Sequence, residues 1–112
     1  MSQTQLPPYD IVRLTSYQNE LATIIDYLAE NASYKVALQL VEDIQLQLDL
    51  VTTLPQIYPA YAPAPRFRKM PIHNWQYVAF YTINKQKRQI ILTHIYHTSR
   101  DIHSIMQGKK YF

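Results

Sequence analysis

His97 is the side chain of this 112-residue chain that is best suited to move a proton, because an unperturbed imidazole changes charge near neutral pH. It begins a short string in which Arg100 and Asp101 follow within four residues. A proton donor or acceptor beside a cation is what chemistry at a phosphate requires. The alternative is that His97 only orients the end of the chain, by pairing with Asp101.

Four positively charged side chains are candidates for holding a phosphate: Arg66, Arg68, Lys69 and Arg100. Arginine is preferred because its planar guanidinium can bind two phosphate oxygens at once. We expect Arg66 and Arg68 on one face of a strand and Lys69 on the other, so all three meet one phosphate only if the strand bulges. The alternative is an ordinary solvated face, or contacts to an acidic partner.

The four histidines do not form a recognisable metal-binding pattern. His94 and His97 are three residues apart, so on one strand they face opposite sides and cannot chelate one ion. His73 and His103 have no partner at a recognisable spacing. The chain also has no cysteine, which excludes disulfides, thiol catalysis and cysteine-ligated zinc. We therefore expect no metal and no cofactor.

Aromatic residues are abundant, with ten tyrosines and one tryptophan. Four of them could form a stacking platform for RNA bases on neighbouring strands: Trp75, Tyr77, Tyr81 and Tyr96. Such residues fit a half-buried strand equally well. Because burial is their commoner use, we predict that Trp75, Tyr77 and Phe80 lie in the core. Tyr58 and Tyr61, in a proline-rich segment, are expected to be exposed.

The first half of the chain predicts a strand followed by two helices. Residues 9–14 alternate and include β-branched side chains, which is typical of a strand. Thr15 and Gln18 have the spacing of a capping box, and apolar residues then recur at helical intervals. Ser33 is a candidate N-cap for a second helix that runs to about Thr53, so the two helices form an antiparallel hairpin. The wide apolar arc of the second helix packs between the sheet and the first helix, or includes a docking surface.

The second half predicts three strands and a short helix. Residues 55–65 hold four of the seven prolines and form an ordered loop. The predicted strands are 66–71, 75–83 and 89–96, and a terminal helix ends at Gly108. This order predicts an α+β fold with the helical hairpin packed on a mostly antiparallel four-stranded sheet. One domain spans residues 1–112, with tails at 1–8 and 107–112.

Charge is divided unequally along the chain. Residues 1–50 hold seven acidic and two basic side chains, a charge of −5, whereas residues 51–112 hold one acidic and nine basic ones, a charge of +8. The basic half points to an anionic partner. Three of its cations lie in the predicted hairpin turn between the last two strands and suit long-range attraction of anions: Lys85, Lys87 and Arg88. The sequence has no apolar run long enough to cross a membrane and no secretory signal at its start, so we expect a cytoplasmic protein without a membrane partner.

Four short segments follow the predicted elements in order: Leu54-Pro55, Arg68-x-Met70-Pro71, Asn74-Trp75 before Tyr77-x-x-Phe80-Tyr81-x-Ile83, and Tyr96-His97-x-x-Arg100-Asp101. Together with the element order, they resemble the RelE/ParE family of bacterial toxins from type II toxin–antitoxin modules. The resemblance covers about residues 9–106. It implies the same α+β fold.

The resemblance implies one of two activities. Members like RelE and YoeB enter the ribosomal A site and cut mRNA without a metal, whereas ParE-like members poison DNA gyrase and are not nucleases. An antitoxin that wraps the toxin neutralises both groups. We expect the binding segment of the antitoxin to be acidic, amphipathic and initially disordered, and to order on the sheet or across the helical hairpin.

Two positions bear on the choice between these activities. His97 follows Tyr96 where YoeB-like members carry a catalytic histidine. Val78, however, stands where ribonucleolytic members usually have an arginine after the tyrosine of the central strand. The loss of a cation that stabilises the transition state would cost several kcal/mol, which counts against cleavage unless Arg68 or Lys69 takes its place.

The resemblance and the residues together predict a type II toxin, with ribosome-bound mRNA as the first candidate target. In that prediction His97, Arg68 and Arg100 are catalytic. The residues that bind RNA or another anion are then Arg66, Lys69, Lys85, Lys87 and Arg88. The alternatives are a ParE-like inhibitor of DNA gyrase without nuclease activity, or an inactive homologue that only binds an antitoxin.

Overall fold

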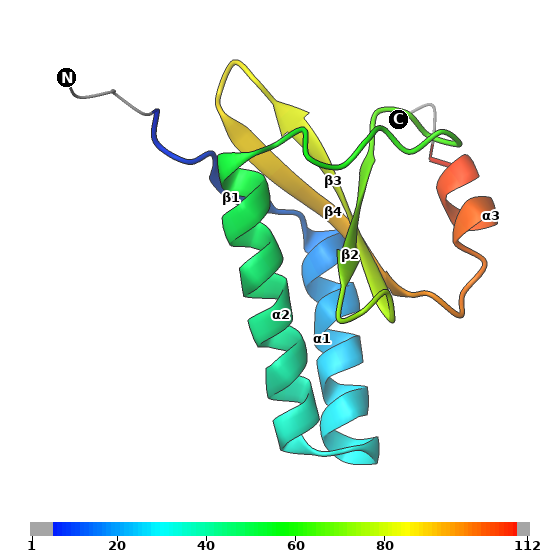
Figure 1. Cartoon of the computed structure of the whole chain (residues 1–112). Helices are drawn as coiled ribbons and strands as arrows, with labels where there is room; N and C mark the ends of the chain where they lie inside the picture. The colour runs from blue at the N-terminus through cyan, green and yellow to red at the C-terminus, as the bar shows by residue number, and fades with distance from the viewer. Residues whose placement is uncertain (1–5, 110–112) are drawn as a thin grey trace.

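The computed structural model describes residues 6–109, which form a four-stranded sheet and three helices in the predicted order (Figure 1). The elements are β1 Asp10–Arg13, α1 Thr15–Asn31, α2 Tyr34–Thr53, β2 Arg68–Ile72, β3 Tyr77–Asn84, β4 Gln89–His97 and α3 Ile102–Gln107. The predicted tails 1–8 and 107–112 lie partly outside the described residues. Among these residues, no helix has both the length and the apolar character that a membrane span requires.

The sheet has the strand order β1-β4-β3-β2. β3 pairs antiparallel with β2 and with β4, while β1 pairs parallel with β4. A parallel pair needs a long crossover, which the helical hairpin and the following strands supply. The predicted α+β fold with a mostly antiparallel sheet is therefore confirmed.

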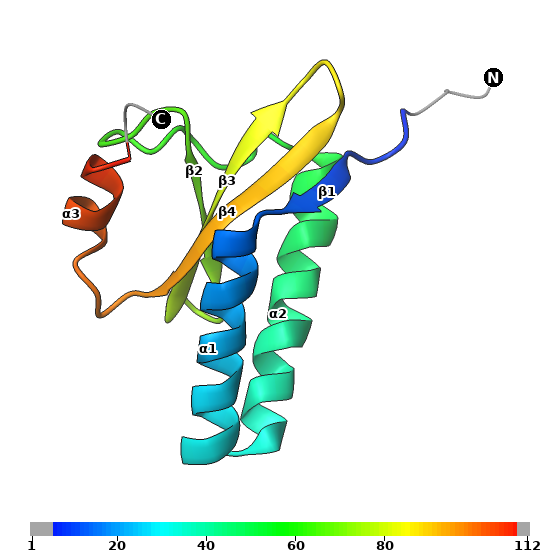
Figure 2. The same cartoon turned by 180° about the vertical axis from the view of Figure 1, so that it is seen from behind.

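Helices cover both faces of the sheet (Figures 1 and 2). α1 and α2 lie antiparallel on one face and bury a large cluster that includes Tyr17, Leu40 and Leu48, which we call the hairpin-side core. α3 covers part of the other face over a smaller cluster, which we call the α3-side core. Its buried members are Ala64, Phe67, Val78, Phe80, Tyr96 and Met106.

A β-bulge in β4 decides which side chains reach each core. Phe80 pairs with His94 and Tyr81 pairs with Leu92, so Thr93 is the extra residue. Its hydroxyl donates to the Phe80 carbonyl at 2.9 Å. Strict alternation from Leu92 would put His94 on the hairpin side. The bulge instead turns His94 to the α3 side.

The start of α1 differs from the prediction, whereas the start of α2 confirms it. Leu14, not Thr15, is the N-cap of α1, and its side chain makes no capping bond. The reason is that the Leu14 amide still donates to Leu92 of β4, which keeps this residue extended until the helix begins. Ser33 caps α2 as predicted, because its hydroxyl accepts from the Val36 amide at 3.1 Å.

β2 begins at Arg68, two residues later than predicted. The Phe67 amide donates to the Ala64 carbonyl in a turn, so Arg66 lies in the loop and does not share a strand face with Arg68. The strand also continues through Pro71 to Ile72. Proline is tolerated there because β2 is an edge strand.

Candidate functional site

His97 lies at the end of β4, exposed, on the face that carries the helical hairpin. It pairs with Tyr77 of β3, and the two rings meet edge to face with centres 5.0 Å apart. The Ser99 amide donates to His97 Nδ1 at 3.0 Å, and the Ser99 hydroxyl lies 2.7 Å from the same atom. Nδ1 is therefore an acceptor, and a neutral His97 carries its proton on Nε2.

A hollow of 380 Å³ lies beside His97. Its lining comes from α1, from the start of β3, and from the end of β4 and the segment after it: Thr23, Ile24, Tyr27, Tyr77, His97 and Ser99. The pairing of His97 with Asp101, which the sequence left open, is not formed. Asp101 instead accepts from the Ser104 amide and caps α3, and this hydrogen bonding holds the pKa of Asp101 below its usual value.

Arg100 does not share the surroundings of His97. Its guanidinium lies 5.2 Å from the ring centre of Tyr96, and Tyr96 belongs to the α3-side core. Burial raises the pKa of the Tyr96 phenol, a neighbouring Glu20 carboxylate raises it further, and Arg100 opposes both effects. Arg100 and His97, which belong to the predicted catalytic set, therefore lie on opposite faces of β4.

Glu20 of α1 is a site residue that the sequence analysis missed. Its carboxylate accepts from the Ile95 amide at 3.2 Å and from His94 Nδ1 at 3.1 Å. His94 in turn stacks on Tyr96, with ring centres 5.5 Å apart. No local signal could reveal this contact, because Glu20 and His94 are 74 positions apart in the chain.

Arg68 is held at the other end of the sheet. Its Nη1 donates to the Tyr58 carbonyl at 2.6 Å, and Arg68 pairs with Tyr81, whereas His97 pairs with Tyr77. Four residues of β3 separate the two positions, roughly 13 Å along the strand. Arg68 therefore fastens the proline-rich loop and does not meet His97. Tyr58 is half-buried, less exposed than predicted.

Lys69 points to the α3 side, where it lies between two aromatic rings. Its Nζ is 5.4 Å from the ring centre of Tyr61 and 5.7 Å from that of Trp75. Tyr61, half-buried where exposure was expected, packs edge-on against Phe80 with ring centres 5.2 Å apart. We call Lys69, Tyr61 and Trp75 the cation–aromatic cluster.

Trp75 is 54% exposed, so the prediction that it belongs to the core is wrong. The reason is the turn between β2 and β3, where His73, Asn74 and Trp75 all adopt the left-handed conformation with φ of 55°, 56° and 67°. This backbone path ends the pleat before Trp75, which therefore cannot take a core position. Tyr77 and Phe80, which follow in β3, are buried as predicted.

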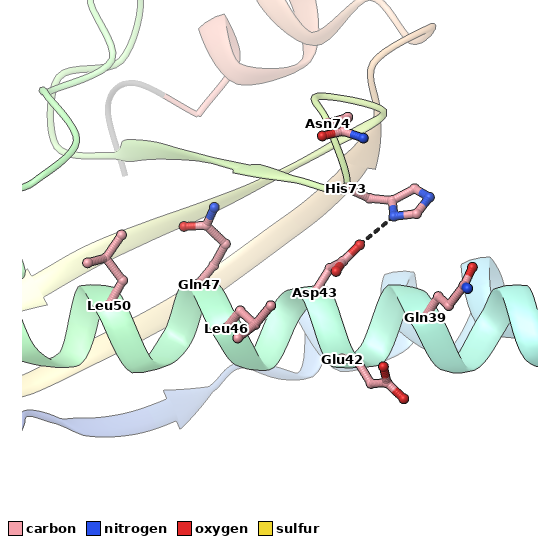
Figure 3. A pocket seen from close by; sticks show the side chains of 8 residues that line it. All are labelled: Gln39, Glu42, Asp43, Leu46, Gln47, Leu50, His73 and Asn74. Carbon is pink, nitrogen blue, oxygen red and sulfur yellow. Dashed lines mark hydrogen bonds and ion pairs between the residues drawn. The ribbon is translucent and has the colours of Figure 1, made fainter.

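The strained turn is braced from two sides. His73 Nδ1 bonds the carboxylate of Asp43, which reaches across from α2 (Figure 3). Both residues line a hollow of 710 Å³ between α2 and the turn. On the other side, the Gln76 carbonyl accepts from the amide and the hydroxyl of Thr98. The turn is thus tied to α2 and to the segment that follows β4.

The remaining predicted anion-binding residues do not gather around His97. Arg66 is exposed, with its guanidinium 4.7 Å from the ring centre of Phe67. Lys85 and Lys87 are exposed in the β3–β4 turn, at the opposite end of β4. Arg88 lies in the same turn but holds the N-terminal segment, since it donates to the Pro7 carbonyl and lies 4.4 Å from the ring centre of Tyr9.

The arrangement brings some predicted residues together and keeps others apart. Lys69 and Arg100 both lie on the α3 side of the sheet. His97 lies on the hairpin side, and Arg68 lies far from His97 along the strands. Val78, at the position of the missing arginine, is buried in the α3-side core. Within residues 6–109, no three histidine or carboxylate side chains gather as metal ligands would, and His73 and His94 each bond one carboxylate.

Comparisons with known proteins agree with the fold. A family model described as the ParE toxin of the type II toxin–antitoxin system parDE matches residues 12–102. A structure of the chromosomal ParDE system from P. aeruginosa is 18% identical, with a TM-score of 0.66 over 80% of this chain and 95% of that one. A toxin–antitoxin complex, RelBE2 from Mycobacterium tuberculosis, is 10% identical, with a TM-score of 0.59 over 88% of this chain and 100% of that one. A comparison with curated proteins found no match.

Proposed function

Because the chain belongs to the ParE toxin family of type II toxin–antitoxin systems, we propose that it arrests growth by binding DNA gyrase rather than by cleaving mRNA. Family membership shows a toxin of this class and supports an antitoxin partner. It leaves the target of the toxin as a proposal, since one fold can serve several activities.

The separation of the candidate catalytic residues carries this proposal. Cleavage of RNA without a metal needs a proton donor or acceptor within reach of the cations that stabilise the phosphate. Arg68 is bonded to the Tyr58 carbonyl at a distant point of the sheet, and Arg100 lies over Tyr96 on the other face from His97. Val78 supplies no cation between them. A protein that acts by binding needs no such convergence.

Pulse labelling after induced expression in a bacterial host tests the proposal. We expect thymidine incorporation to fall within the first minutes, with DNA damage, while methionine incorporation falls later. His97→Ala is the matched variant, and it should remain toxic because binding of gyrase does not use an acid or base. An early loss of methionine incorporation that His97→Ala abolishes would overturn the proposal, and so would an absence of any effect.

Cleavage of ribosome-bound mRNA is the second candidate function, and one observation favours it. His97 is exposed, and among the described residues its hydrogen bonds use Nδ1 only, so the protonated Nε2 remains for a ligand. A proton at that atom could be given to the leaving 5′ oxygen of RNA. In this case translation in a purified system should stop with mRNA cut at discrete positions. His97→Ala should slow cleavage by about 10²-fold or more.

A further inference from the structure

Trp75 is the only tryptophan of the chain, and it lies in a turn with a strained backbone that holds its side chain outward. Three consecutive residues other than glycine, His73, Asn74 and Trp75, are left-handed, a conformation that such residues keep only where the surrounding structure supports it. The turn persists because Asp43 bonds His73 on one side and Thr98 bonds Gln76 on the other. Because strained residues cluster at binding sites, the exposed ring on this braced turn is a candidate contact surface.

The neighbours of Trp75 supply positive charge. Lys69 lies between the rings of Trp75 and Tyr61, so the ammonium and two aromatic faces meet at one place. Arg100 lies on the same side of the sheet over Tyr96. Lys69 is on β2 and Tyr96 on β4, two strands apart, which is roughly 10 Å. A few nucleotides of an extended strand cover that span.

The presence of both aromatic rings and cations at this surface favours one class of anionic ligand over the others. A phosphate alone, or a carboxylate of a peptide, would use Lys69 and Arg100 but would gain little from an exposed indole. Unpaired bases stack on aromatic side chains while their phosphates bind nearby cations. Paired bases are buried in a duplex stack and cannot do so.

We propose that the cation–aromatic cluster, with Arg100 beside it, binds single-stranded nucleic acid. A base stacks on Trp75, and the backbone phosphates contact Lys69 and Arg100. The proposal does not depend on the target of the toxin, because the site is formed without His97. It assigns a ligand to Trp75, which neither proposed activity uses.

Intrinsic fluorescence tests the proposal directly, since Trp75 is the sole tryptophan. We expect twelve-nucleotide oligo(dT) and oligo(U) to quench the emission of the purified full chain, and a matched duplex not to do so. The better of the two single strands identifies DNA or RNA as the source. In anisotropy measurements with a labelled oligonucleotide, Trp75→Ala should bind roughly 5- to 150-fold more weakly, while Trp75→Phe keeps most of the affinity.

Two charge variants separate this site from general attraction. Lys69→Ala should weaken binding and reduce its salt dependence by about one phosphate contact. Lys35→Ala removes the same charge from an exposed position in α2, on the other face of the sheet, and should bind nearly as the native chain does. Circular dichroism checks that each variant is folded.

Three results would overturn the proposal. One is equal weakening by Lys69→Ala and Lys35→Ala with no effect of Trp75→Ala, which means attraction of any polyanion. The second is equal binding of the duplex. The third is quenching of Trp75 by an acidic peptide with no binding of either oligonucleotide, which assigns the surface to a protein partner. Because gyrase inhibition is measured separately, a failure here is distinguishable from a failure of the proposed function.

Discussion

Glu20 provides a hydrogen-bond acceptor on the part of the β4 edge that β1 does not cover. β1 pairs only with Gln89–Leu92, so the Ile95 amide beyond it has no partner strand, and the Glu20 carboxylate accepts its hydrogen. The same carboxylate bonds His94, which stacks on Tyr96. One side chain of α1 thereby fixes both the helix against the sheet and the stack that carries Arg100.

We predict that Glu20→Ala lowers the free energy of unfolding by about 1–3 kcal/mol, because it leaves the Ile95 amide and His94 without their acceptor. Glu20→Gln should cost less, since its amide oxygen can still accept from Ile95. Urea unfolding followed by circular dichroism measures both effects. Asp26→Ala, an exposed position on the same helix, is the matched control. Equal stability of Glu20→Ala and Asp26→Ala would contradict the role assigned to Glu20.

At the scale of elements, a buried tyrosine and an arginine tie the proline-rich loop to the sheet. The Tyr81 hydroxyl of β3 donates to the Pro55 carbonyl at 2.8 Å, next to the bond between Arg68 and the Tyr58 carbonyl. Burial raises the pKa of Tyr81 to about 12, while the nearby Arg68 lowers it. In the unfolded chain a tyrosine ionises near pH 10.

This difference predicts a loss of stability in alkali. Between about pH 10 and pH 12 the unfolded state gives up the Tyr81 proton and the folded state keeps it, so the free energy of unfolding falls as the pH rises. The contribution is fully present below pH 10. Tyr81→Phe should fall less steeply over this range, and near pH 8 it should be about 1 kcal/mol less stable because the Pro55 carbonyl loses its donor.

Urea unfolding at pH 8, 10 and 11 measures both effects. Tyr34→Phe, on an exposed position of α2, serves as the control and should follow the native chain. Some alkaline slope must remain in Tyr81→Phe, because burial also raises the pKa of Tyr17 and Tyr77. Parallel pH profiles for Tyr81→Phe and the native chain would show that Tyr81 does not carry the effect.

The elements themselves could be predicted from the sequence because their signals are local. Helical spacing of apolar residues, the Ser33 cap and the β-branched runs each depend on a few neighbouring residues. The bulge at Thr93 and the left-handed turn at His73–Trp75 break that regularity without a glycine to mark them. The exposure of Trp75 follows from this turn and was therefore missed.

Most of the candidate site was beyond sequence reasoning for a related reason. The residue types were identified, but their partners come from distant elements, as with Glu20 and His94, Asp43 and His73, or Arg68 and Tyr58. A cation that is predicted to bind phosphate can equally bind a backbone carbonyl, and only the folded chain decides. The predicted roles of His97, Arg68 and Arg100 remain predictions.

At the scale of the whole molecule, charge is separated between layers. The helical hairpin and β1 carry most of the −5 charge of residues 1–50, while the other strands, their loops and α3 carry most of the +8 charge of residues 51–112. α2 also exposes an apolar strip on its outer side at Tyr34, Leu38 and Val41. An acidic partner is therefore attracted to the sheet and repelled by the hairpin, where only apolar contacts favour it.

We predict that the antitoxin binds through an acidic, amphipathic segment that orders on the toxin. Calorimetry with a synthetic acidic amphipathic peptide should show binding that weakens between about 0.1 M and 1 M salt, as the Debye length falls from about 10 Å to 3 Å. A peptide with the same apolar residues and lysine in place of each acid is the control, and it should bind far more weakly. Tight binding of the basic peptide with indifference to the acidic one would refute the prediction. If the acidic segment covers the sheet, it should also displace oligonucleotide from Trp75, because both ligands need Lys69 and Arg100.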